Sequence, residues 1–108
     1  MGQNDTLGEF EHLVSVAIMR LRNNAYGMMI RTEIHKRADR DVSIGAVYTT
    51  LERLEQKGLV SSRVGEPTPE RGGRAKRYYK LTASGVKTLK ASRGALTRMW
   101  KGLRIAEA

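Results

Sequence analysis

The spacing of apolar residues in this chain changes from a helical period to a strand period after Leu59. Upstream of this point, three segments place apolar residues three or four positions apart. Downstream, two short β-prone segments flank a loop that contains two prolines and a Gly-Gly pair, and a last segment returns to the helical period. Because each period favours one type of element, we expect three helices, a β-hairpin and a fourth helix, in that order.

Capping residues and apolar stripes place the first three helices. Thr6 followed by Glu9 predicts a capping box at the start of the first helix. The buried stripe of this helix consists of Phe10, Leu13, Val14, Ala17, Ile18 and Leu21. A second helix is expected from about Tyr26 to Ala38. A third helix begins at Ser43, a favourable N-cap residue, and ends before Gly58, a favourable residue after a helix. Its apolar stripe consists of Ile44, Val47, Tyr48, Leu51 and Leu54.

The hairpin and the last helix complete the predicted fold. We expect strands over Val60–Val64 and Ala75–Leu81, and a helix that is capped by Thr82 and runs to about Arg104. Apolar side chains at heptad spacing predict that this helix dimerises; they are Val86, Leu89, Leu96, Trp100 and Leu103. The expected fold class is mainly α with a small β-hairpin. It is a winged helix-turn-helix over residues 1–82, continuous with a C-terminal dimerisation helix over residues 83–108.

The net positive charge lies entirely in the second half of the chain. Residues 1–59 contain eight basic and eight acidic side chains, whereas residues 60–108 contain twelve basic and three acidic ones and carry the whole net charge of +9. Five of these cations lie within ten residues around the predicted hairpin tip: Arg71, Arg74, Lys76, Arg77 and Lys80. Such a one-sided excess favours a polyanionic partner, with nucleic acid ahead of an anionic membrane surface.

The third helix has a face suited to the major groove of DNA. A recognition helix must present small or hydrogen-bonding side chains to base edges, because a bulky face cannot approach them. The side chains expected on this face are Ser43, Gly45, Ala46, Thr49, Thr50 and Arg53, and the ring of Tyr48 is expected in the core with its hydroxyl within reach of a phosphate. The predicted wing contacts on the DNA backbone are Arg71, Gly72, Gly73, Arg74, Lys76 and Arg77.

Catalytic and metal-binding patterns are missing from the sequence. The chain has no cysteine, and His12 and His35 lie in different predicted helices without a partner at metal-ligand spacing. We therefore expect no enzyme activity, no metal and no cofactor. The polar N-terminus does not resemble a signal peptide and no apolar run reaches the length of a membrane span, so we expect a cytoplasmic protein without a membrane contact.

Four segments of the chain resemble the PadR family of transcriptional regulators. They are residues 7–11 (LGEFE), 41–51 (DVSIGAVYTTL), 69–74 (PERGGR) and 77–85 (RYYKLTASG). The resemblance implies a homodimeric repressor that binds pseudo-palindromic operator DNA, in the branch with a single C-terminal dimerisation helix. It also implies relief by a small molecule, for which Trp100 is a candidate stacking residue for a planar aromatic effector; the alternative role of Trp100 is dimer packing.

Two other functions remain open from the residues alone. The winged helix could be a protein–protein interaction module in which the basic hairpin docks an acidic partner. It could also be a nucleic-acid-binding protein without sequence specificity, held by charge only.

Overall fold

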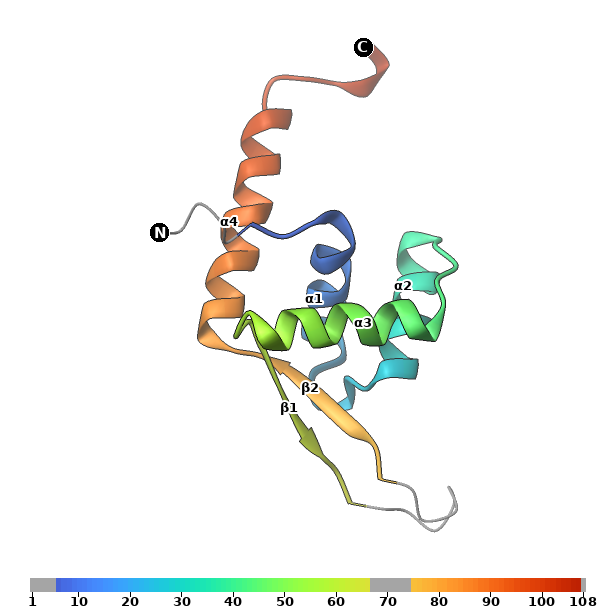
Figure 1. Ribbon diagram of the computed structural model, residues 1–108. Coiled ribbons are helices and arrows are strands. Elements are labelled where there is room, and N and C mark those ends of the chain that lie inside the picture. The colour runs from blue at the N-terminus through green and yellow to red at the C-terminus, as the bar shows by residue number, and fades with distance from the viewer. Residues whose placement is uncertain (1–5, 67–74, 108) are drawn as a thin grey trace.

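The computed structural model describes residues 6–66 and 75–107 of the 108-residue chain (Figure 1). Its elements are α1 (Glu9–Leu21), the 3-10 helix η1 (Arg22–Asn24), α2 (Gly27–Ala38), α3 (Ile44–Gln56), β1 (Val60–Val64), β2 (Arg77–Leu81), α4 (Ala83–Trp100) and the 3-10 helix η3 (Ile105–Glu107). The mainly helical winged-helix fold is thus confirmed. The three N-terminal helices form the body, while the hairpin and α4 extend from it in different directions (Figure 1).

One hydrophobic core lies between α1, α2, α3 and the base of the hairpin. Its largest fully buried apolar side chains are Val14, Ile30, Val47, Leu51 and Leu54. These positions belong to the apolar stripes of the three helices, which face one another because each helix buries one side only. Partly buried residues such as Phe10 and Leu21 close the edges of the core.

The hairpin is a two-stranded antiparallel sheet in which Val60 pairs with Leu81 and Val64 pairs with Arg77. Tyr79, in the middle of β2, turns its side chain into the core and is buried. Burial raises the pKa of the Tyr79 hydroxyl, because the charged form is poorly solvated there. The Tyr79 N–H donates to the carbonyl oxygen of Ala25 at 2.8 Å, which ties β2 to the connection between α1 and α2.

The first helix starts two residues later than the sequence indicates, so the expected Thr6–Glu9 capping box is wrong. Gly8 is the N-cap residue of α1, and its N–H donates to Glu11 Oε1 at 2.9 Å. The Lys57 ammonium donates to the other oxygen, Glu11 Oε2, also at 2.9 Å. Glu11 therefore joins the start of α1 to the end of α3, a contact between distant segments that local sequence cannot reveal.

The last helix begins as expected but ends earlier. Thr82 Oγ1 accepts from the Gly85 N–H at 3.0 Å and donates to the Gly58 carbonyl oxygen at 2.7 Å. The helix stops at Trp100 rather than near Arg104, and Gly102 follows with φ at +84°. A glycine in this left-handed conformation ends the helix at low steric cost.

Candidate nucleic-acid interface

The exposed face of α3 is built from its N-cap outward. The Ser43 side-chain oxygen accepts from the Ala46 N–H at 3.0 Å, which satisfies one of the free donors of the first turn. Gly45, Ala46 and Thr49 are exposed on the first two turns and Arg53 on the next. The N-terminal half of this face thus carries small side chains at the end of the helix that enters a major groove in helix-turn-helix proteins.

Thr50 is not part of this face, contrary to our expectation. Its side chain is only 5% exposed, because position 50 lies on the same side of α3 as the buried residues Val47 and Leu54. Thr50 therefore cannot contact bases without moving the helix from the body. Thr49, its neighbour, is turned outward and stays in the candidate interface.

Tyr48 was expected to place its ring in the core, and this expectation is wrong as well. The residue is 46% exposed, and its ring lies directly over the backbone of Gly27 at the start of α2. A Cβ atom at position 27 would be only 2.5 Å from the Tyr48 hydroxyl oxygen. Glycine thus makes room for the ring, and the hydroxyl lies beside the first residue of α2.

Sequence reasoning missed Glu52 on the exposed face of α3. Glu52 is exposed and lies three residues after Thr49 and seven after Gly45, which is the spacing of one helix face. That spacing was the signal that could have found it. A glutamate on a groove-facing helix can accept a hydrogen bond from the amino group of cytosine.

The predicted wing contacts fall into two groups. Arg71, Gly72, Gly73 and Arg74 lie outside the described residues. Lys76 and Arg77 are described; Lys76 contacts the start of α2, and Arg77 contacts β1. Lys76 Nζ is 4.4 Å from the centroid of the Tyr26 ring, and Arg77 Nη1 donates to Ser62 Oγ at 3.0 Å. Ser62 Oγ in turn donates to Glu55 Oε2 of α3 at 2.8 Å.

A cluster that we call the wing root joins the hairpin to the helical body; it consists of Tyr26, Arg63, Lys76 and Tyr78. The Tyr26 and Tyr78 rings meet edge to face, with centroids 5.6 Å apart. The Arg63 guanidinium lies 4.9 Å from the centroid of the Tyr78 ring. Two cation–π contacts and one ring contact thus orient the wing relative to α2. The sequence pattern did not reveal the parts of Tyr26 and Arg63 in this cluster.

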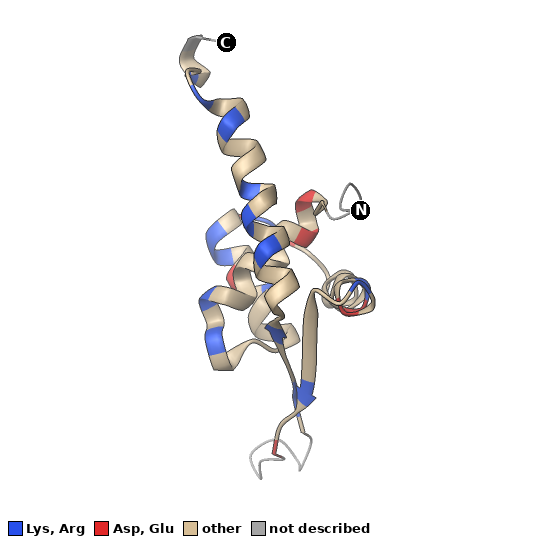
Figure 2. Ribbon diagram, turned by 90° about the vertical axis from the view of Figure 1, so that its left-hand side faces the viewer, with Lys and Arg blue, Asp and Glu red and all other residues tan. Residues whose placement is uncertain are grey.

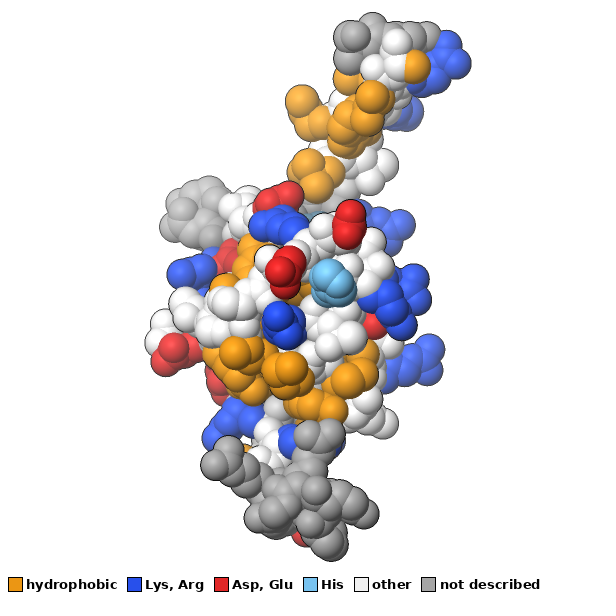
Figure 3. Space-filling model, turned by 90° about the vertical axis from the view of Figure 1, so that its right-hand side faces the viewer, with side chains coloured by type: hydrophobic (Ala, Val, Ile, Leu, Met, Phe, Trp, Pro, Cys, Tyr) orange, Lys and Arg blue, Asp and Glu red, His pale blue; other side chains and the backbone are white. Residues whose placement is uncertain are grey.

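The residues expected to form a dimer interface divide at the middle of α4. Leu89 is only 6% exposed and Val86 is partly buried, because the first half of α4 packs against the body. Leu89 thus has its partners within its own chain, contrary to our expectation. Leu96 and Trp100 are exposed on the part of the helix that projects from the body, and Leu103 is exposed beyond its end. Figure 3 shows hydrophobic side chains along this projecting part of the molecule. Met99 and Ile105, which the heptad spacing did not include, are exposed there as well.

Lysine and arginine positions recur along the ribbon of α4 and occur in the strands of the hairpin (Figure 2). Within the part of the chain that the structure describes, no group of His, Cys, Asp or Glu residues is arranged to hold a metal ion. None of the helices described is long and apolar enough to cross a membrane. The arrangement can therefore bind a polyanion, through an exposed helix face and a basic hairpin.

Comparisons with solved structures identify the fold. A PadR family transcription regulator from Clostridium difficile superimposes with a TM-score of 0.70 at 24% identity, covering 87% of this chain and 92% of that one. A PadR-like transcription factor from Bacteroides fragilis gives a TM-score of 0.65 at 28% identity, covering 83% and 85%. A transcriptional regulator from Clostridium thermocellum gives 0.70 at 22% identity, covering 84% and 85%. Among curated proteins, none matches this chain.

The family model for the transcriptional regulator PadR-like family matches residues 16–91, from the middle of α1 to the first half of α4. This range includes the exposed face of α3, the hairpin and the wing root. Members of the family are transcription regulators rather than enzymes. The chain belongs to the transcriptional regulator PadR-like family.

Proposed function

We propose that this protein is a homodimer that binds a pseudo-palindromic DNA operator and represses transcription. The observation that carries the proposal is the exposed face of α3, where Gly45, Ala46 and Thr49 leave the backbone of the first two turns accessible. Small side chains at these positions allow the helix to enter a major groove closely enough for Thr49 and Arg53 to reach base edges.

The hairpin adds contacts that do not depend on sequence. Lys76 and Arg77 lie where the described part of the wing begins, and Arg71 and Arg74 belong to the segment between the strands. In our proposal these cations bind phosphates beside the major groove. The wing root keeps the hairpin at a constant angle to the body, so the wing and α3 contact one duplex together.

The exposed apolar end of α4 supports the dimer. Five large apolar residues in this part of the chain are more than half exposed: Leu96, Met99, Trp100, Leu103 and Ile105. A patch of this kind is unusual on the surface of a protein that functions as a monomer. In our proposal two copies of this face pack together around a twofold axis. The two α3 helices would then enter successive major grooves about 34 Å apart, which explains the expected symmetry of the operator.

Trp100 is also the candidate residue for an effector. It is 51% exposed and lies beside a shallow hollow of about 500 Å³ between α4 and His12 of α1. In our proposal a planar aromatic molecule stacks on Trp100 at the dimer interface and changes the distance between the two α3 helices. Operator binding would weaken as a result, and repression would be relieved.

Fluorescence anisotropy across a salt series tests DNA binding directly. The probes are the duplex upstream of the protein's own gene and a shuffled duplex of equal length. We expect the upstream duplex to bind at least about a thousandfold more tightly than the shuffled one. The Thr49→Ala and Arg53→Ala variants should reduce this ratio by about tenfold each, while Lys90→Ala, on the exposed side of α4, should not change it.

The outcomes separate the proposal from its alternatives. Equal, salt-sensitive binding of both duplexes would indicate a protein that binds DNA through charge only. Failure to bind either duplex at low salt would contradict the proposal and favour a protein–protein interaction module.

Sedimentation velocity tests the dimer. Trp100→Ala removes the largest side chain of the exposed face, and we expect the dimer dissociation constant to rise by about thirtyfold. Arg98→Ala, two residues away on the other side of α4, is the matched control and should leave the constant within about twofold. A wild-type chain that stays monomeric at about 100 μM would contradict the dimer.

A further inference from the structure

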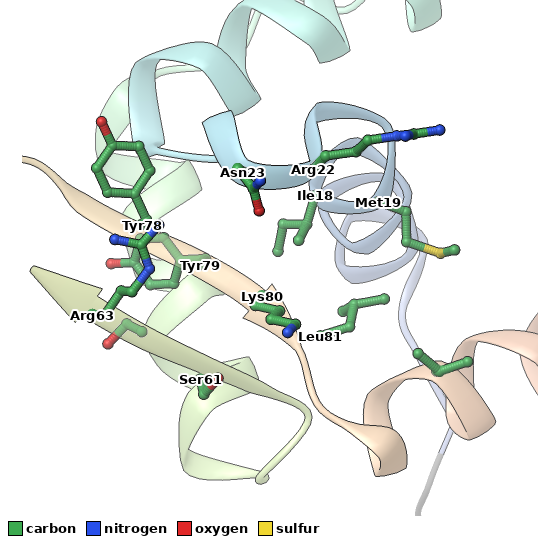
Figure 4. Close-up of a pocket in the computed structure, with 12 residues that line it drawn as sticks. Ile18, Met19, Arg22, Asn23, Ser61, Arg63, Tyr78, Tyr79, Lys80 and Leu81 are labelled. Carbon is green, nitrogen blue, oxygen red and sulfur yellow. The ribbon is translucent and has the colours of Figure 1, made fainter. Parts of the chain in front are cut away.

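A second cavity lies between the hairpin, the end of α1 and the start of α4, away from the exposed face of α3 and from the hollow beside Trp100. Its volume is about 410 Å³, which is within the usual range for a small-molecule site. It is bounded by the outer face of the hairpin, the end of α1 with η1, and the start of α4 (Figure 4). We call it the wing-root pocket, because Arg63 and Tyr78 belong to both its lining and the wing root.

The apolar part of the lining is aliphatic. Ile18 and Met19 from α1, Leu81 from β2 and Val86 from α4 provide it (Figure 4). The lining has two aromatic rings, and both are already engaged. Tyr79 is buried in the core, and Tyr78 contacts Tyr26 and the Arg63 guanidinium. A flexible alkyl chain fits such a surface better than a planar ring, which needs a free ring face for stacking.

The polar part of the lining is cationic. Arg22, Arg63 and Lys80 line the pocket, and no acidic residue does. Within residues 6–66 and 75–107, the side chains of Arg22 and Lys80 have neither a hydrogen-bond nor an ion-pair partner. Two positive charges at the edge of an apolar cavity favour an anionic ligand, because each of them attracts a negative group.

The backbone of Arg22 is a second, independent sign of a binding site. Arg22 has φ at +54° and ψ at −119°, a conformation that suits glycine and strains any residue with a Cβ atom. The chain nevertheless carries an arginine at this turn between α1 and η1. Strain of this kind is concentrated at functional sites.

We propose that the wing-root pocket binds a small aliphatic carboxylate. The alkyl chain lies against Ile18, Leu81 and Val86, and Lys80 binds the carboxylate. The exposed Arg22 side chain, which extends away from the pocket in Figure 4, turns toward the carboxylate and binds it as well. This site is separate from Trp100 and from the DNA-facing side of α3, and its occupation does not depend on DNA binding.

Isothermal titration calorimetry with octanoate tests the proposal on the full chain. We expect saturable binding of one octanoate per chain, and weaker binding of octan-1-ol and benzoate by about tenfold or more. Lys80→Gln should weaken octanoate binding by about tenfold, whereas Lys90→Gln, outside the pocket, should not. Met19→Glu places a negative charge at the pocket and should abolish binding; Met28→Glu, similarly exposed on α2, is its control.

The Arg22→Gly variant separates a loss of octanoate binding from a loss of folding. This change relieves the backbone strain, so the melting temperature should not fall, yet octanoate binding should weaken by about tenfold because one cation is lost. A variant that melts normally and binds octanoate as the wild type does would overturn the role of Arg22.

Four other results would overturn the proposal. The first is the absence of saturable octanoate binding up to about 10 mM. The second and third are affinities for octan-1-ol or for benzoate that equal the affinity for octanoate. The fourth is a loss of octanoate binding in Trp100→Ala but not in the pocket variants. Sedimentation velocity adds a fifth. If Met19→Glu dissociates a dimer that Met28→Glu leaves intact, a second copy of the chain covers the pocket instead of a ligand.

Discussion

Apolar side chains are buried in the helical body and its hairpin but exposed at the projecting end of α4. In the body, Val14, Ile30, Val47, Leu51 and Leu54 are completely buried. In the end of α4 and the residues that follow it, Leu96, Met99, Trp100, Leu103 and Ile105 are all more than half exposed. The body completes its core within one chain, whereas the described residues leave the apolar side chains at the end of α4 uncovered.

The difference shows how a small domain divides its tasks. A helix that projects without tertiary contacts is marginal in water, because most helical stability in proteins comes from packing. In our proposal, a second copy of the chain stabilises the projecting half of α4. The body can stay rigid while that interface changes, which is the property that a regulator with an effector at its dimer interface requires.

Truncating one leucine in each region should produce the largest contrast. Leu51→Ala leaves a cavity in the core and should lower the free energy of unfolding by about 2–5 kcal/mol in urea denaturation. Leu96→Ala, at concentrations where the chain is monomeric, should change it by no more than about 0.5 kcal/mol. A large loss in the second variant would show that the end of α4 packs on its own chain, which would remove the distinction between the regions.

Gly85 and Gly94 test the boundary between the packed and the projecting half of α4. A Cβ atom at Gly85 would lie 2.0 Å from the Leu59 carbonyl oxygen, so Gly85→Ala must displace α4 from the body and should cost about 3 kcal/mol. At Gly94 the nearest atom belongs to the flexible Arg98 side chain, and Gly94→Ala should instead stabilise the helix by up to about 1 kcal/mol. Thermal unfolding of both variants checks the opposite signs.

The smallest expected effect concerns Glu11, which joins α1 to α3 within the body. Burial alone would raise the pKa of this carboxyl, but the Gly8 N–H and the Lys57 ammonium together hold the pKa below its usual value of 4.5. The stabilisation is thus complete at neutral pH and is lost as the pH falls from 4.5 through the lowered pKa.

Glu11→Gln should accordingly lower the free energy of unfolding by about 1 kcal/mol at pH 7 and have a smaller effect at pH 3. Glu9→Gln is the matched control, since the Glu9 side chain is mostly exposed. An equal loss at both pH values would mean that the charge of Glu11 does not stabilise the body.

Much of the fold could be predicted because local signals agree with the tertiary structure. The Ser43 and Thr82 caps, the extents of α2 and α3, and the two strands follow from side-chain hydrogen bonding, hydrophobic period and turn residues close in sequence. The Gly8 cap of α1 could not be recognised in the same way, because its partner Glu11 is also placed by Lys57 from the other end of the body.

The candidate site was predicted in outline but not in its details. The sequence placed the exposed face on α3, yet it put Thr50 outside and Tyr48 inside. Both residues flank the apolar stripe, where a rotation of a few tens of degrees decides burial. The groove left by Gly27 on α2 holds the Tyr48 ring at the surface, and this space exists only once the helices pack.

By itself, the sequence determined the order of the elements, their helical or extended character, and the location of the net positive charge in the second half of the chain. These properties depend on neighbouring residues, whose interactions are present before the chain folds. Only the tertiary structure decided which side chains at the edge of a stripe are buried, how α4 divides into a packed and a projecting half, and where the wing-root pocket lies. Each of these depends on contacts between segments far apart in the sequence, and such contacts exist only in the packed molecule.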